Sequence, residues 1–180
     1  WTEWGSPLLY NSFLQCGKLR EFFKKFTKHN FSIDVAMRYG KPSIEKKLIE
    51  YHRKGFKKVL ILPMFPQYST TTAKSIANKL KLILKNNAEL DKSLDISFIK
   101  DFHDNPKYIK ASANHIRKYQ TKHGQPQKLL FSFHGIPKSY VGDDEPYQKQ
   151  CLITANLIAE ELGLAHAAAR LRAMPPLRPP

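Results

Sequence analysis

The chain has 180 residues, 42% of them hydrophobic and 12% aromatic, which suits one ordinary domain or one domain and an incomplete second. This composition excludes a wholly disordered chain, and no apolar run reaches the roughly 18–20 residues that cross a bilayer. The net charge of +15 is compatible with a nucleic acid or an anionic surface as partner. However, the lysines are spread through every helix-like stretch without an Arg-rich cluster, so we predict that they cover solvated helix faces and that nucleic acid is not a partner.

Short β-rich segments alternate along the chain with longer segments of helical periodicity. In chain order the pattern predicts a helix over 10–29, a strand over 31–37, a helix over 43–54, strands over 57–63 and 94–100 around a helix over 70–85, a helix over 106–122, a strand over 128–133 and a helix over 145–162. Gly55 and Gly163 are placed to end two of these helices. Residues 59–62 are apolar at every position, which is typical of a strand covered on both faces. The alternation predicts an α/β fold with a doubly wound, Rossmann-like parallel sheet and helices on both faces.

The two ends of the chain differ from its middle. Residues 1–5 carry neither an initiator Met nor a signal-peptide pattern, so the chain is expected to begin inside a longer protein. From residue 165 the composition switches to Ala, Arg and Pro, which predicts an extended tail after a lost or replaced reading frame. We therefore divide the chain into an α/β region over 1–164 and an atypical tail over 165–180. Cys16 and Cys151 lack CxxC spacing and are expected to be idle thiols in a reducing cytosol.

Polar and aromatic residues follow each predicted strand. Ligands bind an open parallel sheet beyond the carboxyl ends of its strands, so these segments are where a site is expected. They read RYG at 38–40, PMFPQYS at 63–69, DFHD at 101–104 and HGIP at 134–137.

The same segments resemble motifs of the ferrochelatase family. The similar stretches are GSPL at 5–8, MRYGKPS at 37–43, PQYSTTT at 66–72, DFHDNP at 101–106 and LFSFHGIP at 130–137, followed by an echo of the family's GDPYxxQC around 143–151. They cover roughly residues 5–164, in order and with compatible spacing. The resemblance implies two Rossmann-like domains, the second incomplete here, with a porphyrin cleft between them.

The resemblance also implies a reaction, the insertion of ferrous iron into a porphyrin in haem synthesis. The family's metal-site histidine maps to His134, as metal ligand and proton acceptor. Both roles suit an imidazole, because ferrous iron accepts imidazole ligands and histidine titrates near neutral pH. The expected porphyrin-cleft residues are Ser6, Arg38, Tyr68, Ser69, Phe102 and His103. The sequence leaves open whether the porphyrin is protoporphyrin IX or its coproporphyrin precursor.

Each of these residues also has a structural interpretation. His134 could bond a backbone carbonyl at the end of its strand, and His103 could serve only the start of a helix. Ser69 or a following Thr is a good helix N-cap, and Ser6 fits a turn. Arg38 could meet a porphyrin propionate or pair with an acidic neighbour.

Two family features are expected to be missing from this chain. The family's opening strand and loop do not precede residue 1, and its glutamate partner of the histidine does not appear before the tail. A smaller departure is the different spacing of the acidic loop at 142–146. The isolated chain is therefore expected to be weakly active or inactive.

Several alternatives stay open. The chain could be a catalytically inactive porphyrin-binding fragment or paralogue, or a relative that inserts cobalt or nickel. No cofactor beyond the substrate iron is implied, and the residues present give no cysteine cluster for an iron–sulfur centre. The expected location is the cytoplasm, with peripheral attachment to the inner membrane as an alternative; the oligomeric state is left open.

Overall fold

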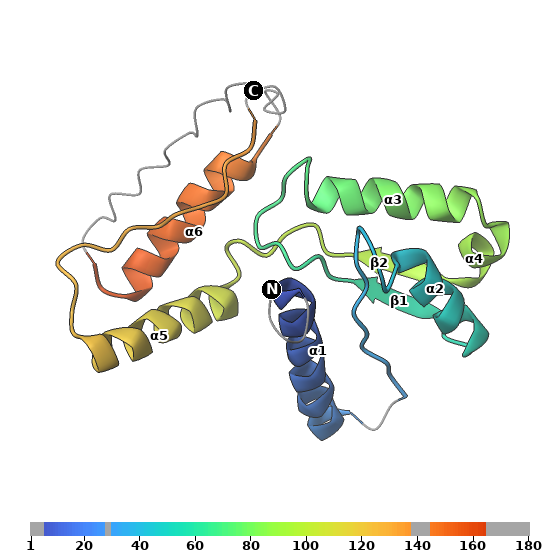
Figure 1. The fold of residues 1–180 in the computed structure, drawn as a ribbon, viewed down its shortest axis with the longest axis horizontal. Coiled ribbons are helices and arrows are strands. Elements are labelled where there is room, and N and C mark those ends of the chain that lie inside the picture. Colours follow the sequence, from blue (N-terminus) through green and yellow to red (C-terminus); the bar gives the residue numbers. More distant parts are fainter. Residues whose placement is uncertain (1–5, 28–29, 138–144, 165–180) are drawn as a thin grey trace. The chain divides into compact units, whose positions relative to one another are not determined.

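The computed structural model describes residues 6–27, 30–137 and 145–164, and the chain divides into two compact units (Figure 1). The first unit comprises Trp1–Lys57 and Leu80–Asp95, and the second comprises Lys58–Lys79 and Ile96–Pro180. The predicted tail over 165–180 and most of the acidic loop at 142–146 lie outside the described residues.

The first unit is helical. It contains α1 (Pro7–Phe26), α2 (Ile44–Arg53) and α4 (Ala88–Ser93). Along α1 only Cys16 is buried, whereas large apolar side chains such as Phe13 (50% exposed), Phe22 (54%) and Phe26 (71%) face outward. Helix α1 begins three residues before the predicted start and ends three residues before the predicted end.

Local capping explains where α2 begins and ends. The Ser43 hydroxyl accepts a hydrogen bond from the Lys46 N–H at 3.2 Å, as an N-cap does. Gly55 has a φ of +78°, a left-handed conformation that glycine adopts without steric cost, and so ends the helix as predicted. His52 then ties α2 to α4, since its ring nitrogens lie 3.0 Å from a Glu89 oxygen and 2.8 Å from the Ser93 hydroxyl.

The second unit contains a small parallel sheet. Strand β1 (Lys58–Ile61) pairs with β2 (Asp95–Phe98). The Asp95 N–H donates to the Lys57 carbonyl at 2.7 Å and the Ile99 N–H to the Ile61 carbonyl at 3.0 Å, a constant offset that defines parallel pairing. Helix α3 (Ala73–Lys85) begins in this unit and ends in the first.

Two further helices of the second unit, α5 (Pro106–His123) and α6 (Tyr147–Glu161), lie side by side (Figure 1). They enclose a core of Ile109, Ala113 and Ile158. Asn105 caps α5, because its side-chain oxygen accepts from the Lys107 N–H at 3.0 Å. Helix α6 ends close to Gly163, which has a φ of +74°.

The mixed α/β class is confirmed, but two of the four predicted strands do not form among the described residues. Residues 31–37 are extended and make only an isolated bridge between Met37 and Ser43, and residues 128–133 are extended without a ladder. The carbonyl of Ile33 instead accepts from the Cys16 thiol and the Arg20 guanidinium. These two side chains therefore occupy the Ile33 carbonyl, which a neighbouring strand would otherwise use as a hydrogen-bond acceptor.

The prediction of a doubly wound sheet covered on both faces is consequently not met in the described residues. Val59 of β1 is buried, but Leu60 is 64% exposed and Leu62 is 42% exposed. The short helix α4 was not predicted, although Asn87 caps it through the Leu90 N–H at 3.2 Å.

Candidate functional site

The PQYSTTT segment at 66–72 links β1 to α3, and hydroxyl groups within it bond to one another and to its backbone. Ser69 is fully buried, and its hydroxyl accepts from the Thr72 N–H at 3.2 Å and lies 2.6 Å from the Thr72 hydroxyl. Lys74 N–H donates to the Ser69 carbonyl at 3.2 Å, where α3 begins. Ser69 therefore acts as a cap, in agreement with its structural interpretation.

The DFHD segment at 101–104 follows β2 and lies beside the PQYSTTT segment. The Phe102 N–H donates to the Pro66 carbonyl at 2.9 Å, and the Phe102 ring meets Tyr108 edge-on at 5.4 Å. His103 Nδ1 lies 2.8 Å from Asp101 Oδ1, and its side chain is only 12% exposed. This carboxylate contact fixes the ring and leaves Nε2 for a ligand.

Side chains of the kinds that bind metal ions lie close together in the 101–104 segment. Among the described residues, Asp101, His103 and Asp104 form the one group of three whose ligand atoms all lie within 4.8 Å of one another. Carboxylate and imidazole donors suit ferrous iron. Asp101 already uses Nδ1 of His103, so the group also serves to orient the imidazole.

Helix α6 supplies the polar side chains that hold both segments. Gln150 Oε1 accepts from the Tyr68 N–H at 2.6 Å. The Thr154 hydroxyl accepts from the Gln67 side-chain amide at 3.0 Å and donates to the His103 carbonyl at 2.8 Å. Gln67, Gln150 and Thr154 are all buried, and the bond between Gln67 and Thr154 is fully shielded from competing water, whereas the bonds to the Tyr68 N–H and the His103 carbonyl are partly buried.

The side chain of Glu145, just before α6, contacts the 66–72 segment. Its Oε2 accepts from the Thr70 N–H at 3.0 Å, while its Oε1 and the Thr70 hydroxyl are buried without a partner in the described structure. Burial, and then the nearby Glu145 carboxylate, raises the pKa of Tyr68. The Lys100 ammonium lies 4.7 Å from the centre of the Tyr68 ring, a cation–π contact.

His134 is exposed and follows the extended segment 128–133. No group of three metal-ligand side chains among the described residues includes it. Burial and the neighbouring Cys151 thiol raise the pKa of Tyr147, in the first turn of α6, to about 12. Burial also raises the pKa of Cys151 to about 11.

An open hollow of about 530 Å³ lies between α5, α6 and the extended segment that precedes His134. Its aromatic lining includes Tyr108, Phe131 and Phe133, and Thr154 reaches its floor. The second unit therefore combines aromatic surface, a carboxylate–imidazole pair and a buried polar network.

The remaining predicted cleft residues, Ser6 and Arg38, belong to the first unit. Ser6 stands at the N-cap position of α1 but makes no side-chain cap bond. The Arg38 guanidinium lies 4.4 Å from the centre of the Tyr39 ring.

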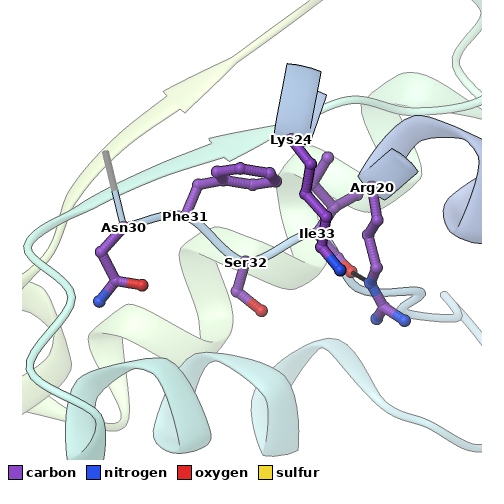
Figure 2. A pocket seen from close by; sticks show the side chains of 6 residues that line it. All are labelled: Arg20, Lys24, Asn30, Phe31, Ser32 and Ile33. Atoms are coloured by element: carbon purple, nitrogen blue, oxygen red, sulfur yellow. Dashed lines mark hydrogen bonds between the residues drawn. The ribbon is translucent and has the colours of Figure 1, made fainter. Parts of the chain in front are cut away.

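The first unit contains a pocket of about 320 Å³ (Figure 2). None of its lining residues was predicted to belong to a functional site: Arg20, Lys24, Asn30, Phe31, Ser32 and Ile33. Arg20 turns to the Ile33 carbonyl at 2.5 Å and to Asp34 at 2.7 Å. The Asp34 carboxylate therefore already neutralises the guanidinium of this pocket.

The structure thus brings together Tyr68, Ser69, Phe102 and His103, all of which the sequence singled out. The residues that hold them were missed: Gln67, Asp101, Glu145, Gln150 and Thr154. One signal could have revealed two of them, because Gln150 and Thr154 recur at positions i and i+4 of a largely apolar helix.

Comparison with known proteins agrees with this assignment of motifs. A family model described as ferrochelatase matches residues 2–171. The chain is 40% identical over 164 residues to a ferrochelatase of Marinobacter nauticus, covering 91% of this chain and 44% of that protein. It is 41% identical over 167 residues to ferrochelatase 2 of Shewanella oneidensis, covering 92% and 49%. It is also 40% identical over 168 residues to a ferrochelatase of Wigglesworthia glossinidia brevipalpis, covering 92% and 49%.

The chain spans about half the length of these curated relatives. The matched region contains every segment from which the site was built. The chain belongs to the ferrochelatase family.

Proposed function

We propose that this chain carries the His134 side of a ferrochelatase site, in which ferrous iron replaces two pyrrole protons of a porphyrin to give haem. The observation that supports this most is the convergence of the 66–72 and 101–104 segments on one face of α6, within a chain of this family. The relatives compared above are ferrochelatases, and this chain is proposed to contribute to the same activity.

In this proposal His134 has two roles, ligand to the incoming iron and acceptor of a pyrrole proton. Its side chain is exposed, so a planar substrate could reach it without a rearrangement of the core. A neutral imidazole can donate its lone pair either to iron or to a proton.

Tyr68, Phe102 and His103 are the proposed porphyrin contacts of the second unit, with Ser69 as the cap that sets the Tyr68 backbone. Aromatic faces stack on a macrocycle, and a held imidazole can point at its centre or edge. Ser6 and Arg38 are proposed contacts of the first unit, and Arg38 has the charge that would pair with a propionate.

Iron is proposed as the substrate and not as a resident cofactor. The chain offers two cysteines, Cys16 and Cys151, both free and buried, whereas an iron–sulfur cluster takes about four thiolates. Protoporphyrin IX and coproporphyrin are the two substrates to compare.

A second candidate function is porphyrin binding without metallation. No described residue places a carboxylate in a three-ligand group with His134. A lone exposed imidazole binds a hydrated metal ion weakly, so binding without chemistry is the specific alternative.

We also propose that segments 31–37 and 128–133 become strands of a larger parallel sheet in the complete, doubly wound family fold. Both are extended already, and Leu130 is 76% exposed as an unpaired strand would leave it.

A cytoplasmic location with peripheral contact to the inner membrane is the proposed setting. None of the described helices is long and apolar enough to cross a membrane. Peripheral contact is supported by the outward aromatic side chains of α1 and by the net charge of +15. Co-sedimentation with anionic and neutral vesicles tests it, and equal absence from both pellets would contradict it.

The decisive experiment is an anaerobic porphyrin titration of the chain and its His134→Ala variant, followed by Soret absorbance with and without ferrous iron. Porphyrin binding by both proteins, with metallation only when His134 is present, is the expected result for ferrochelation. Binding by both without metallation would favour the binding-only function. No binding by the folded chain to either porphyrin would contradict both.

A further inference from the structure

Two side chains of α6 contact two separate segments of the proposed site. Gln150 accepts from the backbone N–H of Tyr68 at 2.6 Å, and the Thr154 hydroxyl lies 2.8 Å from the backbone carbonyl of His103, with the Gln150 carbonyl as a second acceptor at 3.0 Å. Positions i and i+4 of a helix lie on one face, so one rigid element reaches both segments. We call Gln150 and Thr154 the α6 polar face.

Neither segment has secondary structure of its own at these positions. Residues 66–69 and 101–103 lie outside the helices and strands of the described chain. A backbone N–H or carbonyl in such a segment has no ladder or helix partner, and a buried one must find another acceptor or donor. The α6 polar face supplies those partners.

The two side chains that make these contacts are buried, so the loss of either contact should change the conformation of the loop that it holds. Thr154 is 1% exposed and Gln150 is 9% exposed. Removing either side chain leaves a partly buried main-chain group without its partner, so the loop would shift to find another. Because Thr154 also accepts from Gln67, one hydroxyl couples the residue before Tyr68 to the carbonyl of His103.

We propose that the α6 polar face is a positioning surface, which sets the relative placement of the Tyr68 and His103 segments and thereby the affinity for porphyrin. Gln150 and Thr154 act through the backbone of these segments, so they are positioning residues. The consequence for porphyrin affinity rests on the proposed function; the consequence for the loops does not.

The first test needs no porphyrin. Amide hydrogen exchange at Tyr68 is measured in the chain and in Gln150→Met, which keeps the length of the side chain but lacks the acceptor, and in Gln150→Glu, which keeps an acceptor. Exchange at Tyr68 should accelerate at least tenfold in Gln150→Met and stay within about threefold in Gln150→Glu. Equal protection in the chain and Gln150→Met would overturn the inference, whether or not porphyrin binds.

The second test measures porphyrin affinity in Thr154→Val, which is isosteric but lacks the hydroxyl, and in Thr154→Ser, which retains it. We expect about tenfold weaker binding for Thr154→Val and binding within about twofold of the parent for Thr154→Ser. Ile109→Val is the matched control, since Ile109 is buried in the α5–α6 core and takes part in neither of the hydrogen bonds that hold Tyr68 and His103.

The outcomes separate the two proposals. Thr154→Val that binds porphyrin like the parent would overturn the positioning role. So would Ile109→Val that loses as much affinity as Thr154→Val at the same loss of thermal stability. A parent chain that binds no porphyrin contradicts the proposed function alone, and hydrogen exchange then decides the positioning role by itself.

Discussion

The hydroxyl of Thr154 donates to the backbone carbonyl of His103 over 2.8 Å. The two residues are 51 positions apart, and the bond joins the middle of α6 to the segment that carries the carboxylate–imidazole pair. The same hydroxyl accepts from the Gln67 amide at 3.0 Å, and the Gln150 carbonyl, also at 3.0 Å, is a second acceptor within reach of its single proton. The Thr154 hydroxyl therefore lies where three parts of the chain meet.

The hydrogen bond between Tyr51 and Asp34 should contribute to the stability of the first unit. The Tyr51 hydroxyl donates to Asp34 Oδ2 at 2.9 Å, and burial and that carboxylate raise the pKa of Tyr51. We expect Tyr51→Phe to lower the free energy of unfolding by about 1–3 kcal/mol, because the carboxylate loses a donor. Urea unfolding measures this. Tyr39→Phe is the control, since Tyr39 is 74% exposed, and an equal loss in both would contradict the assignment.

Asp34 should make the chain less stable in acid. Burial opposes its ionisation, but hydrogen bonds from Ser32 and Tyr51 and the charges of Lys47 and Arg20 outweigh burial and lower the pKa of Asp34. A carboxyl group whose pKa is lower when folded stabilises the fold above its unfolded pKa of about 4, and that contribution is lost as the pH falls through the folded pKa.

Asp34→Asn should therefore flatten the pH dependence of the unfolding free energy below about pH 4, and lower stability at pH 7. Urea unfolding at a series of pH values between 2 and 7 measures both effects. The same acid slope in the parent and in Asp34→Asn would show that other carboxyl groups control it.

The Cys151 thiol should be unreactive in the folded chain. Its side chain is fully buried, and burial raises its pKa to about 11, so little thiolate is present at neutral pH. In a Cys16→Ser background, which isolates Cys151, we expect reaction with an aromatic disulfide reagent to be at least a hundredfold slower in buffer than in denaturant. Raising the pH from 7 to 9 should accelerate it by a larger factor than it accelerates a small free thiol, because a free thiol with a pKa near 8.5 approaches full ionisation in this range and Cys151 does not. Rapid reaction without denaturant would contradict the buried position of Cys151.

Asn105 should be needed for the start of α5. Its side-chain oxygen accepts from the N–H groups of Lys107 at 3.0 Å and Tyr108 at 3.4 Å. We expect Asn105→Ala to cost about 0.5–2 kcal/mol of unfolding free energy, and Asn105→Asp to retain most of it, because aspartate is also a good N-cap. Lys110→Ala, at an exposed position of the same helix, should change stability by no more than about 0.5 kcal/mol. Thermal unfolding of all three variants tests this. An Asn105→Ala variant as stable as the parent would contradict the capping role of Asn105.

The sequence was most informative where structure is local. The helices formed close to their predicted bounds, because apolar periodicity, the caps Ser43 and Asn105 and the positive-φ glycines act within a few residues. Strands β1 and β2 were also correct. The short helix α4 was missed, since six residues are too few to show a helical period, and only its Asn87 cap signals it.

The strands at 31–37 and 128–133 were wrong for the described chain for a different reason. A strand exists only when another backbone supplies its hydrogen bonds, and that partner is not encoded in the segment itself. At Ile33 the partners turned out to be the side chains of Cys16 and Arg20.

The sequence by itself determined the helices, the two central strands, the family and the short list of site residues, because these depend on local spacing and on motif wording. Only the tertiary structure decided which of those residues meet. It joined Tyr68 to Gln150 and His103 to Thr154 across 82 and 51 positions, contacts that no local pattern specifies. The physical reason is that buried main-chain groups of irregular segments must be paired, and the fold alone determines which side chain lies within reach.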